Sequence, residues 1–193
     1  MVIDHGTSAR TESPPPGPIG LDAKSGTPKQ SQASMADQIV AYPRQRQGQR
    51  VGDGECFTLT DRALRNAGAR SAADFGQVTP NADYVWGTSV TLADLRPGDV
   101  IQFRDYRFTK HVVIERSNET VTQDEDGDRP HHTAIVESIG ANGAVTVLEQ
   151  NAPEGSGVGR HELYFRSGTT TSGNTTTTIT VSGTLWFYRP QAR

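Results

Sequence analysis

The only cysteine of the 193-residue chain, Cys56, lies where a thiol ionises easily. It follows the glycine-rich stretch Val51-Gly-Asp-Gly-Glu55, and apolar residues then recur three and four positions apart. This spacing predicts a helix that begins near Cys56 and ends at Gly68, where a left-handed cap would fit. Free N–H groups at a helix start stabilise an anion, and Asp53 is the expected N-cap. We therefore expect a thiol pKa below the usual value of about 8.5, although most lone cysteines are simply small buried residues.

A nucleophilic cysteine needs a base and a group that orients the base. His132 precedes the β-prone stretch 133–136, and Glu149 and Asn151 follow another such stretch, 145–148. Side chains alternate along a strand, so Glu149 and Asn151 should share one face while Gln150 points to the other. Gln150→Ala should therefore reduce turnover far less than Glu149→Gln and serves as a neutral control. Of the two adjacent histidines, His132 shares a face with residues 134 and 136, whereas His131 points to the other face. We therefore assign the base to His132. The alternatives are a surface histidine and exposed strand charges.

The elements that would position these residues are two helices followed by strands. Apolar spacing predicts a helix from about residue 35 that is stopped at or soon after Pro43. Short runs of β-forming residues predict antiparallel strands, with 140–143 as a hairpin and the threonine-rich segment 169–178 as a hairpin tip or loose loop. Helices before a meander indicate an α+β domain, with the helices packed on one side of an antiparallel sheet or half-barrel. The strands are expected at 100–104, 133–136, 145–148, 162–165, 177–181 and 184–188.

Composition divides the chain into two parts. Residues 1–34 hold five of the eleven prolines among Gly, Ser, Thr and Gln, with few large apolar side chains. Such a segment buries too little surface to offset the entropy lost on ordering, so we expect a disordered tail and a domain over residues 35–193.

Charge and hydropathy narrow the classes of function. The net charge of −3 gives no basic field for nucleic acid, and no apolar run is long enough to span a membrane. The N-terminus lacks a secretory signal, so the sequence as written is expected to be cytoplasmic, or extracellular or in a cell wall if it is processed or exported otherwise. One cysteine allows no internal disulfide.

The acidic run 119–128 resembles part of a calcium loop, because Asp124, Asp126 and Asp128 alternate. However, Arg129 replaces the required glycine and Ile135 replaces the closing glutamate. We expect a solvated loop, and neither a metal ion nor another cofactor.

Four motifs in this order resemble the papain-like CHAP and NlpC/P60 superfamily of cysteine amidases and peptidases, over about residues 35–190. The resemblance implies Cys56 as the nucleophile, His132 as the base, Glu149 as the orienting residue and Asn151 as an auxiliary polar group. The NlpC/P60 branch usually has a second histidine as the orienting residue, so Glu149 favours the CHAP branch. The motifs are Gly52-Asp-Gly-Glu-Cys56-Phe-x-Leu59, Leu95-Arg-Pro-Gly-Asp-Val-Ile-Gln-Phe103, His132-Thr-Ala-Ile-Val136 and Val147-Leu-Glu-Gln-Asn151.

The superfamily hydrolyses amide bonds, which implies a peptide or peptidoglycan-like substrate. The pair Trp86-Gly87 and the segments 102–104 and 187–190 are also similar to a papain-like domain of some fungal actin-patch adaptor proteins. That resemblance implies a non-catalytic module that binds a protein partner. In either case we expect Trp86 and Tyr84 to line the binding groove.

Overall fold

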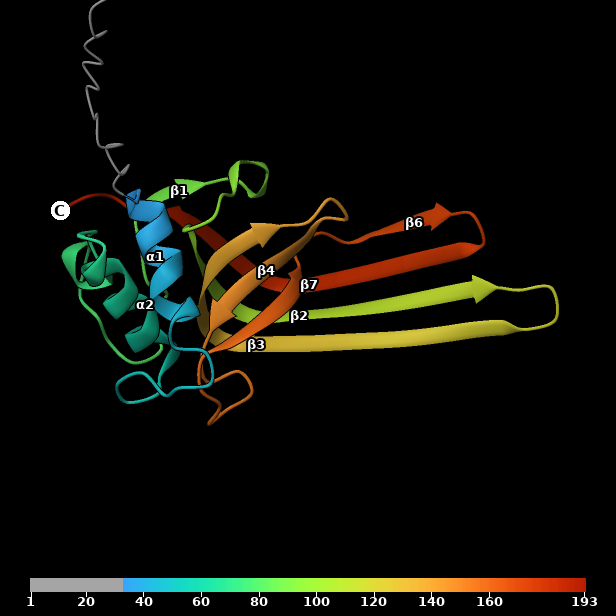
Figure 1. Cartoon of the computed structure of the whole chain (residues 1–193), viewed down its shortest axis with the longest axis horizontal. Helices are drawn as coiled ribbons and strands as arrows, with labels where there is room; N and C mark the ends of the chain where they lie inside the picture. Colours follow the sequence, from blue (N-terminus) through green and yellow to red (C-terminus); the bar gives the residue numbers. More distant parts are fainter. Residues whose placement is uncertain (1–32) are drawn as a thin grey trace, which may run out of the picture. The chain divides into compact units, whose positions relative to one another are not determined.

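The computed structural model describes residues 33–193, so the segment predicted as a tail lies outside the described residues except for its last two positions (Figure 1). Two helices, α1 (Met35–Arg44) and α2 (Cys56–Asn66), precede the strands. Two short 3-10 helices, Ala72–Asp74 and Leu92–Asp94, lie in the connections. No helix within the described part is long and apolar enough to cross a membrane.

Seven strands form one antiparallel sheet in the order β1-β7-β2-β3-β4-β5, with β6 paired to β7. The last strand of the chain, β7, therefore lies between β1 and β2. The strands are β1 (Thr88–Val90), β2 (Val100–Glu115), β3 (Thr120–Ile139), β4 (Ala144–Glu149), β5 (Gly159–Tyr164), β6 (Gly168–Ser172) and β7 (Thr175–Arg189).

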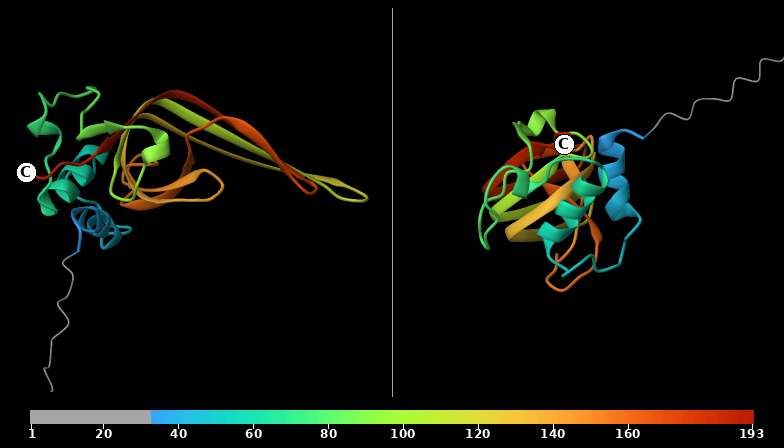
Figure 2. Two further views of the ribbon diagram at one scale, coloured as in Figure 1. Left: turned by 90° about the horizontal axis from the view of Figure 1, so that it is seen from above. Right: turned by 90° about the vertical axis from the view of Figure 1, so that its left-hand side faces the viewer.

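The two faces of the sheet bury different cores. On one face, α1 and α2 pack against Val100, Ile135 and Leu148, at the end of the sheet shown in Figure 2. On the other face the sheet curls over itself, and the Tyr106 hydroxyl in β2 donates a hydrogen bond to the Tyr164 carbonyl at the end of β5 (2.6 Å). This arrangement confirms the predicted α+β architecture with helices on an antiparallel half-barrel.

The helix boundaries follow from local chemistry. Ser34 and Asp37 form a reciprocal capping box at the start of α1, and Pro43 lies in its last turn, as predicted. Gly68 follows α2 with a φ of +71°, the predicted left-handed position. The prediction for Asp53 is wrong: Glu55 occupies the N-cap position without a side-chain bond, and Asp53 accepts from the Glu55 N–H (3.0 Å). Asp53 therefore shapes the loop before the helix.

The strands are longer than the sequence predicts. The 140–143 hairpin is confirmed between β3 and β4, and residues 169–178 form the predicted hairpin tip between β6 and β7. The acidic run is not a solvated loop, because residues 120–128 are the first half of β3 and pair with β2. Residues 112–114 of β2 are β-formers, and both faces of this region are open to water, so the carboxylates fit in a strand without burial.

Beyond a bend, β2, β3 and β7 continue past the body and, with β6, form an arm that we define as residues 107–128 and 168–182 (Figure 1). A β-bulge interrupts the pairing of β2 with β7 at the bend, where Asp105 has a φ of +53°. Gly183 is required there because a Cβ would lie 2.4 Å from the Asp105 carbonyl oxygen. No residue from 109 to 126 is buried, so this part of the arm is a single layer without a core.

Candidate active site

Cys56 is the first residue of α2, at the end of a loop held by the sheet. Gly52 and Gly54, with φ values of +64° and +93°, give the loop its tight course. The buried Gln150 side chain accepts from the Val51 N–H (2.9 Å) and donates to the carbonyls of Val51 (3.0 Å) and Glu55 (2.7 Å). Gln150 does point away from Glu149, as predicted, but it is not a neutral control because it fixes the loop that carries Cys56.

The structure brings His132, and not His131, to the thiol. His132 is 5% exposed and lies in β3, close enough to Cys56 for the imidazole to lower the thiol pKa. His131 points to the other side of the strand and donates from Nε2 to the Ala82 carbonyl (2.8 Å). The strand register assumed from the sequence is therefore the one observed.

Glu149 lies at the centre of a buried cluster and has no exposed surface. Its Oε2 lies 2.9 Å from His132 Nε2, although off the direction of the ring N–H, which makes this contact an ion pair more than an aligned hydrogen bond. Since Nε2 faces Glu149, the Nδ1 edge of His132 is left for Cys56.

Two further residues hold Glu149, and sequence reasoning missed both. Arg129 donates from Nε to Oε2 (2.9 Å) and from its terminal nitrogen to Oε1, which makes the pair bidentate. His161 Nδ1 lies 2.8 Å from Oε1. The available signal was physical: a buried carboxylate requires a counter-charge, and Arg129 lies three positions before His132.

The cluster shifts the pKa values of its members so that the charged form of each is favoured. Burial raises the pKa of Cys56, but the hydrogen bond and charge of His132 and the bonds from Thr133 outweigh it, so the thiol pKa lies below its usual value. Burial lowers the pKa of His132, whereas Cys56 and Glu149 together raise it to about 9. Burial also opposes ionisation of Glu149, yet Arg129 and the histidines hold its pKa well below the usual range. The favoured state is a thiolate beside an imidazolium.

Cys56 opens onto a groove of about 720 Å³ between β3 and the loop after β4. Asn151 lies on this groove but not beside His132: it follows the end of β4 with a φ of +64°, donates to Glu55 (3.3 Å) and accepts from the Gly155 N–H (2.6 Å). The prediction that Asn151 shares a strand face with Glu149 is wrong because the chain leaves the strand geometry after Glu149. The groove is lined by Glu55, Cys56, Asn81, residues 126–132, residues 151–154 and His161.

Trp86 and Tyr84 do not line the groove. Trp86 is fully buried and donates to Gln102 Oε1 (3.2 Å), so it is a core residue and not a binding surface. Tyr84 is half-buried, packs edge-on against Phe57 with 4.9 Å between ring centroids, and donates to the Thr79 carbonyl (2.9 Å). Both aromatic rings pack against Phe57, the second residue of α2, and so support the start of this helix.

Within residues 33–193, no group of three or more His, Cys, Asp or Glu side chains is arranged to hold a metal ion.

Comparison with known proteins gives one family. The model of the AIM3/BBC1 cysteine proteinase-fold domain matches residues 9–193. The match supports the papain-like fold and the similarity to actin-patch adaptor proteins, whereas it does not confirm the CHAP or NlpC/P60 assignment. No curated protein and no solved structure matches the chain.

Proposed function

The chain belongs to the AIM3/BBC1 cysteine proteinase-fold domain family, and from this premise we propose that it is a thiol hydrolase that cleaves amide bonds in peptides. One observation carries the proposal: Cys56, His132 and Glu149 form a connected set at the floor of an open groove, with the thiol pKa lowered and the imidazole pKa raised. Shifted pKa values that arise from burial together with a specific charge partner in a cleft are typical of catalytic sites.

The proposed reaction has two steps. In the first, the Cys56 thiolate attacks the amide carbonyl, and backbone N–H groups at the start of α2 stabilise the oxyanion. The C–N bond breaks as His132 gives its proton to the leaving amine, which leaves a thioester. In the second step, neutral His132 takes a proton from water, the hydroxide attacks the thioester, and the acid and the thiolate are released.

The surrounding residues would keep His132 in place through this cycle. Glu149 stabilises the imidazolium, and Arg129 and His161 compensate the buried carboxylate so that it stays ionised. Gln150 keeps the thiol at the groove by fixing the loop before Cys56.

The test combines alkylation with turnover. Wild-type protein should react with iodoacetamide near pH 6, and His132→Ala should move this reaction to higher pH, since the imidazolium no longer stabilises the thiolate. Peptide libraries and purified peptidoglycan, incubated with wild type and with Cys56→Ala, should show cleavage only by the wild type. His131→Ala is the matched control for the alkylation measurement, because its Nε2 donates to the Ala82 carbonyl and its side chain points away from Cys56. A thiol that is unreactive from pH 5 to 9, or activity that survives in Cys56→Ala, would exclude the hydrolase.

The alternative is a non-catalytic module that binds a protein partner. The observation that favours it is the groove itself, which continues along β3 toward the arm and offers more contact surface than bond cleavage requires. Under this alternative, wild type and Cys56→Ala bind the same partner with equal affinity, and neither cleaves it.

A further inference from the structure

β3 has a long free edge on the side of the Cys56 groove. Its ladder with β4 begins only at Ile135, and residues 132–134 are buried, so the accessible part of β3 without a strand partner on that side runs from Thr120 to His131 among the described residues. Apart from Pro130, which has no N–H, the outward-facing N–H and C=O groups of this edge are available to an added strand. Natural sheets usually shorten or cover an edge of this length.

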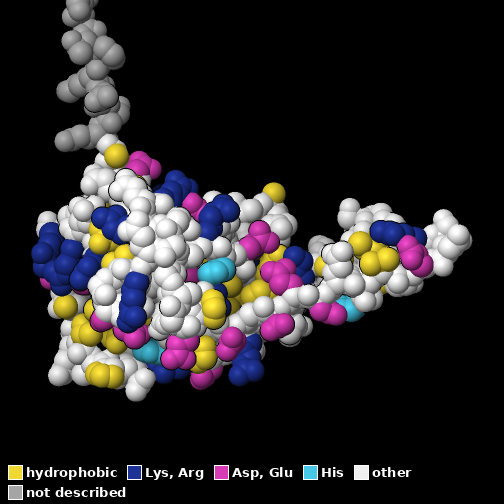
Figure 3. Space-filling view, turned by 60° about the horizontal axis from the view of Figure 1, so that its bottom comes forward, with side chains coloured by type: hydrophobic (Ala, Val, Ile, Leu, Met, Phe, Trp, Pro, Cys, Tyr) yellow, Lys and Arg dark blue, Asp and Glu magenta, His cyan; other side chains and the backbone are white. Residues whose placement is uncertain are grey.

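The free edge carries negative charge. Figure 3 shows acidic side chains gathered along the side of the arm where β3 runs, and the residues involved are Asp124, Glu125, Asp126 and Asp128. Two of the four are paired, Asp124 with His111 (2.6 Å) and Glu125 with Lys110 (3.0 Å). Within residues 33–193, no ion pair is formed by the carboxylates of Asp126 or Asp128, although Arg107 lies opposite Asp128 on β2, so both carboxylates can meet charges of a partner.

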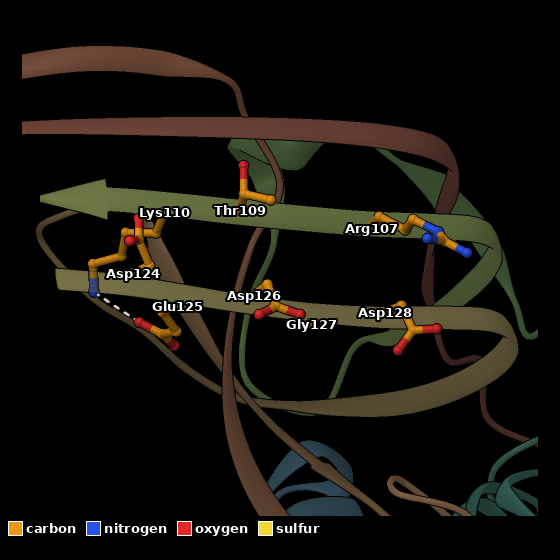
Figure 4. Close-up of a pocket in the computed structure, with 8 residues that line it drawn as sticks. All are labelled: Arg107, Thr109, Lys110, Asp124, Glu125, Asp126, Gly127 and Asp128. Atoms are coloured by element: carbon orange, nitrogen blue, oxygen red, sulfur yellow. Dashed lines mark hydrogen bonds and ion pairs between the residues drawn. The ribbon is translucent and has the colours of Figure 1, made fainter.

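The edge and the groove are one continuous surface. Asp126, Gly127 and Asp128 line the Cys56 groove, and they also line a second hollow of about 560 Å³ on the arm, whose lining residues on the paired strands β2 and β3 are drawn in Figure 4. A chain lying along β3 from the arm toward the body would therefore reach Cys56.

We propose that the β3 edge takes up an extended, lysine- and arginine-rich segment of a partner protein as an additional strand, which leads into the Cys56 groove. The backbone groups of β3 give the strand its affinity, and the free carboxylates select a cationic sequence. Binding at this edge does not require the thiol, so the inference goes beyond the proposed hydrolysis and stands independently of it.

Charge and composition exclude two other occupants. A second copy would place one acidic edge against another, and like charges on facing strands are destabilising. The chain's own residues 1–32 carry three lysines or arginines and three acidic residues, and their five prolines lack the N–H that a ladder needs.

The experiment is selection from a random peptide library, with peptides of about 12 residues, on the full chain carrying Cys56→Ala. This length covers the free edge at about 3.3 Å per residue. We expect the selected peptides to be rich in lysine and arginine and poor in proline. Asp126→Asn combined with Asp128→Asn should weaken their binding about tenfold. The matched control is Glu115→Gln with Glu119→Gln, which removes the same charge near the arm's tip and should change binding less than about twofold.

Hydrogen exchange gives the second readout. Bound peptide should slow amide exchange in residues 120–131 and leave β6, the opposite edge of the arm, unchanged. Selected peptides without excess positive charge, equal losses in the two double variants, or protection outside β3 would overturn the proposal. Loss of turnover in wild type would leave these binding results intact, so failure of the hydrolase and failure of the edge site are distinguishable.

Discussion

The buried cluster at Glu149 and the exposed arm use the same kinds of charged side chains in two opposite ways. The Arg129–Glu149 pair is bidentate, and its side chains are 12% and 0% exposed. The Lys110–Glu125 pair joins β2 to β3 on the arm, with side chains 25% and 45% exposed. Burial makes the first pair a fixed unit that shifts neighbouring pKa values, whereas water and salt screen the second. The difference teaches that in this fold burial, and not the presence of ion pairs, separates the part for which we propose chemistry from the part for which we propose partner binding.

The largest contrast is expected in turnover. Glu149→Gln removes the charge behind His132 and should lower kcat/KM roughly 10²- to 10⁴-fold, because the imidazolium loses its stabilisation. Glu125→Gln removes an equal charge from the arm and should leave turnover of a small neutral peptide unchanged. Steady-state kinetics on both variants measures the contrast, and equal losses would mean that the buried cluster has no special role.

Stability gives the second contrast. Arg129→Met leaves Glu149 as a buried carboxylate facing only histidines, and the free energy of unfolding should fall by about 3–5 kcal/mol. Glu125→Gln breaks the exposed pair with Lys110 but leaves the bond from Lys110 to the Tyr164 hydroxyl, and should cost less than about 1 kcal/mol. Urea denaturation of both variants checks the difference. Adding Glu149→Gln to Arg129→Met should recover part of the loss, and a further additive loss would argue against a coupled pair.

Hydrogen bonds show a smaller version of the same contrast. Gln150→Ala leaves the buried Val51 N–H without its acceptor, so it should cost about 1–3 kcal/mol and lower the alkylation rate of Cys56. Thr171→Ala removes an exposed hydroxyl that pairs with Thr176 (3.1 Å) in the arm and should change stability by less than about 0.5 kcal/mol. Thermal unfolding and iodoacetamide kinetics measure both effects. A stable and fully reactive Gln150→Ala would restore it as a neutral control.

The smallest effect is a shift in pH dependence. Turnover needs the thiolate and the protonated imidazole together, so its acid limb should lie below the usual thiol pKa and its alkaline limb near pH 9, where His132 loses its proton. Alkylation needs only the thiolate and should show no alkaline limb. Glu149→Gln should move the alkaline limb to lower pH, since a negative charge that raises the His132 pKa is gone. Neutralising Asp128 on the arm should leave both limbs in place, and an equal shift would point to long-range charge alone.

The sequence permitted several correct predictions because they depend on local patterns. Apolar residues three and four apart and a glycine at the left-handed position defined α2, and alternation along a strand placed His132 and His131 on opposite sides. The same alternation failed for Asn151, because a strand pattern gives no warning of where the strand ends. The prediction that Trp86 lines the groove was wrong for a related reason. An aromatic residue beside a glycine in the sequence is as typical of a core as of a groove, and Trp86 is fully buried.

By itself, the sequence determined the chemical types at the site, the order of helices before strands and the face of each short strand, since all of these follow from neighbours a few positions apart. Only the tertiary structure decided which charges became partners. Arg129 and His161 meet Glu149 across distances of 20 and 12 residues through the β3–β4 and β4–β5 ladders, and the acidic run became an edge strand because β2 extends beside it. A strand's own sequence specifies its two faces but not its neighbour, and burial, which turns a pair of charges into a pKa shift, exists only after the sheet has closed.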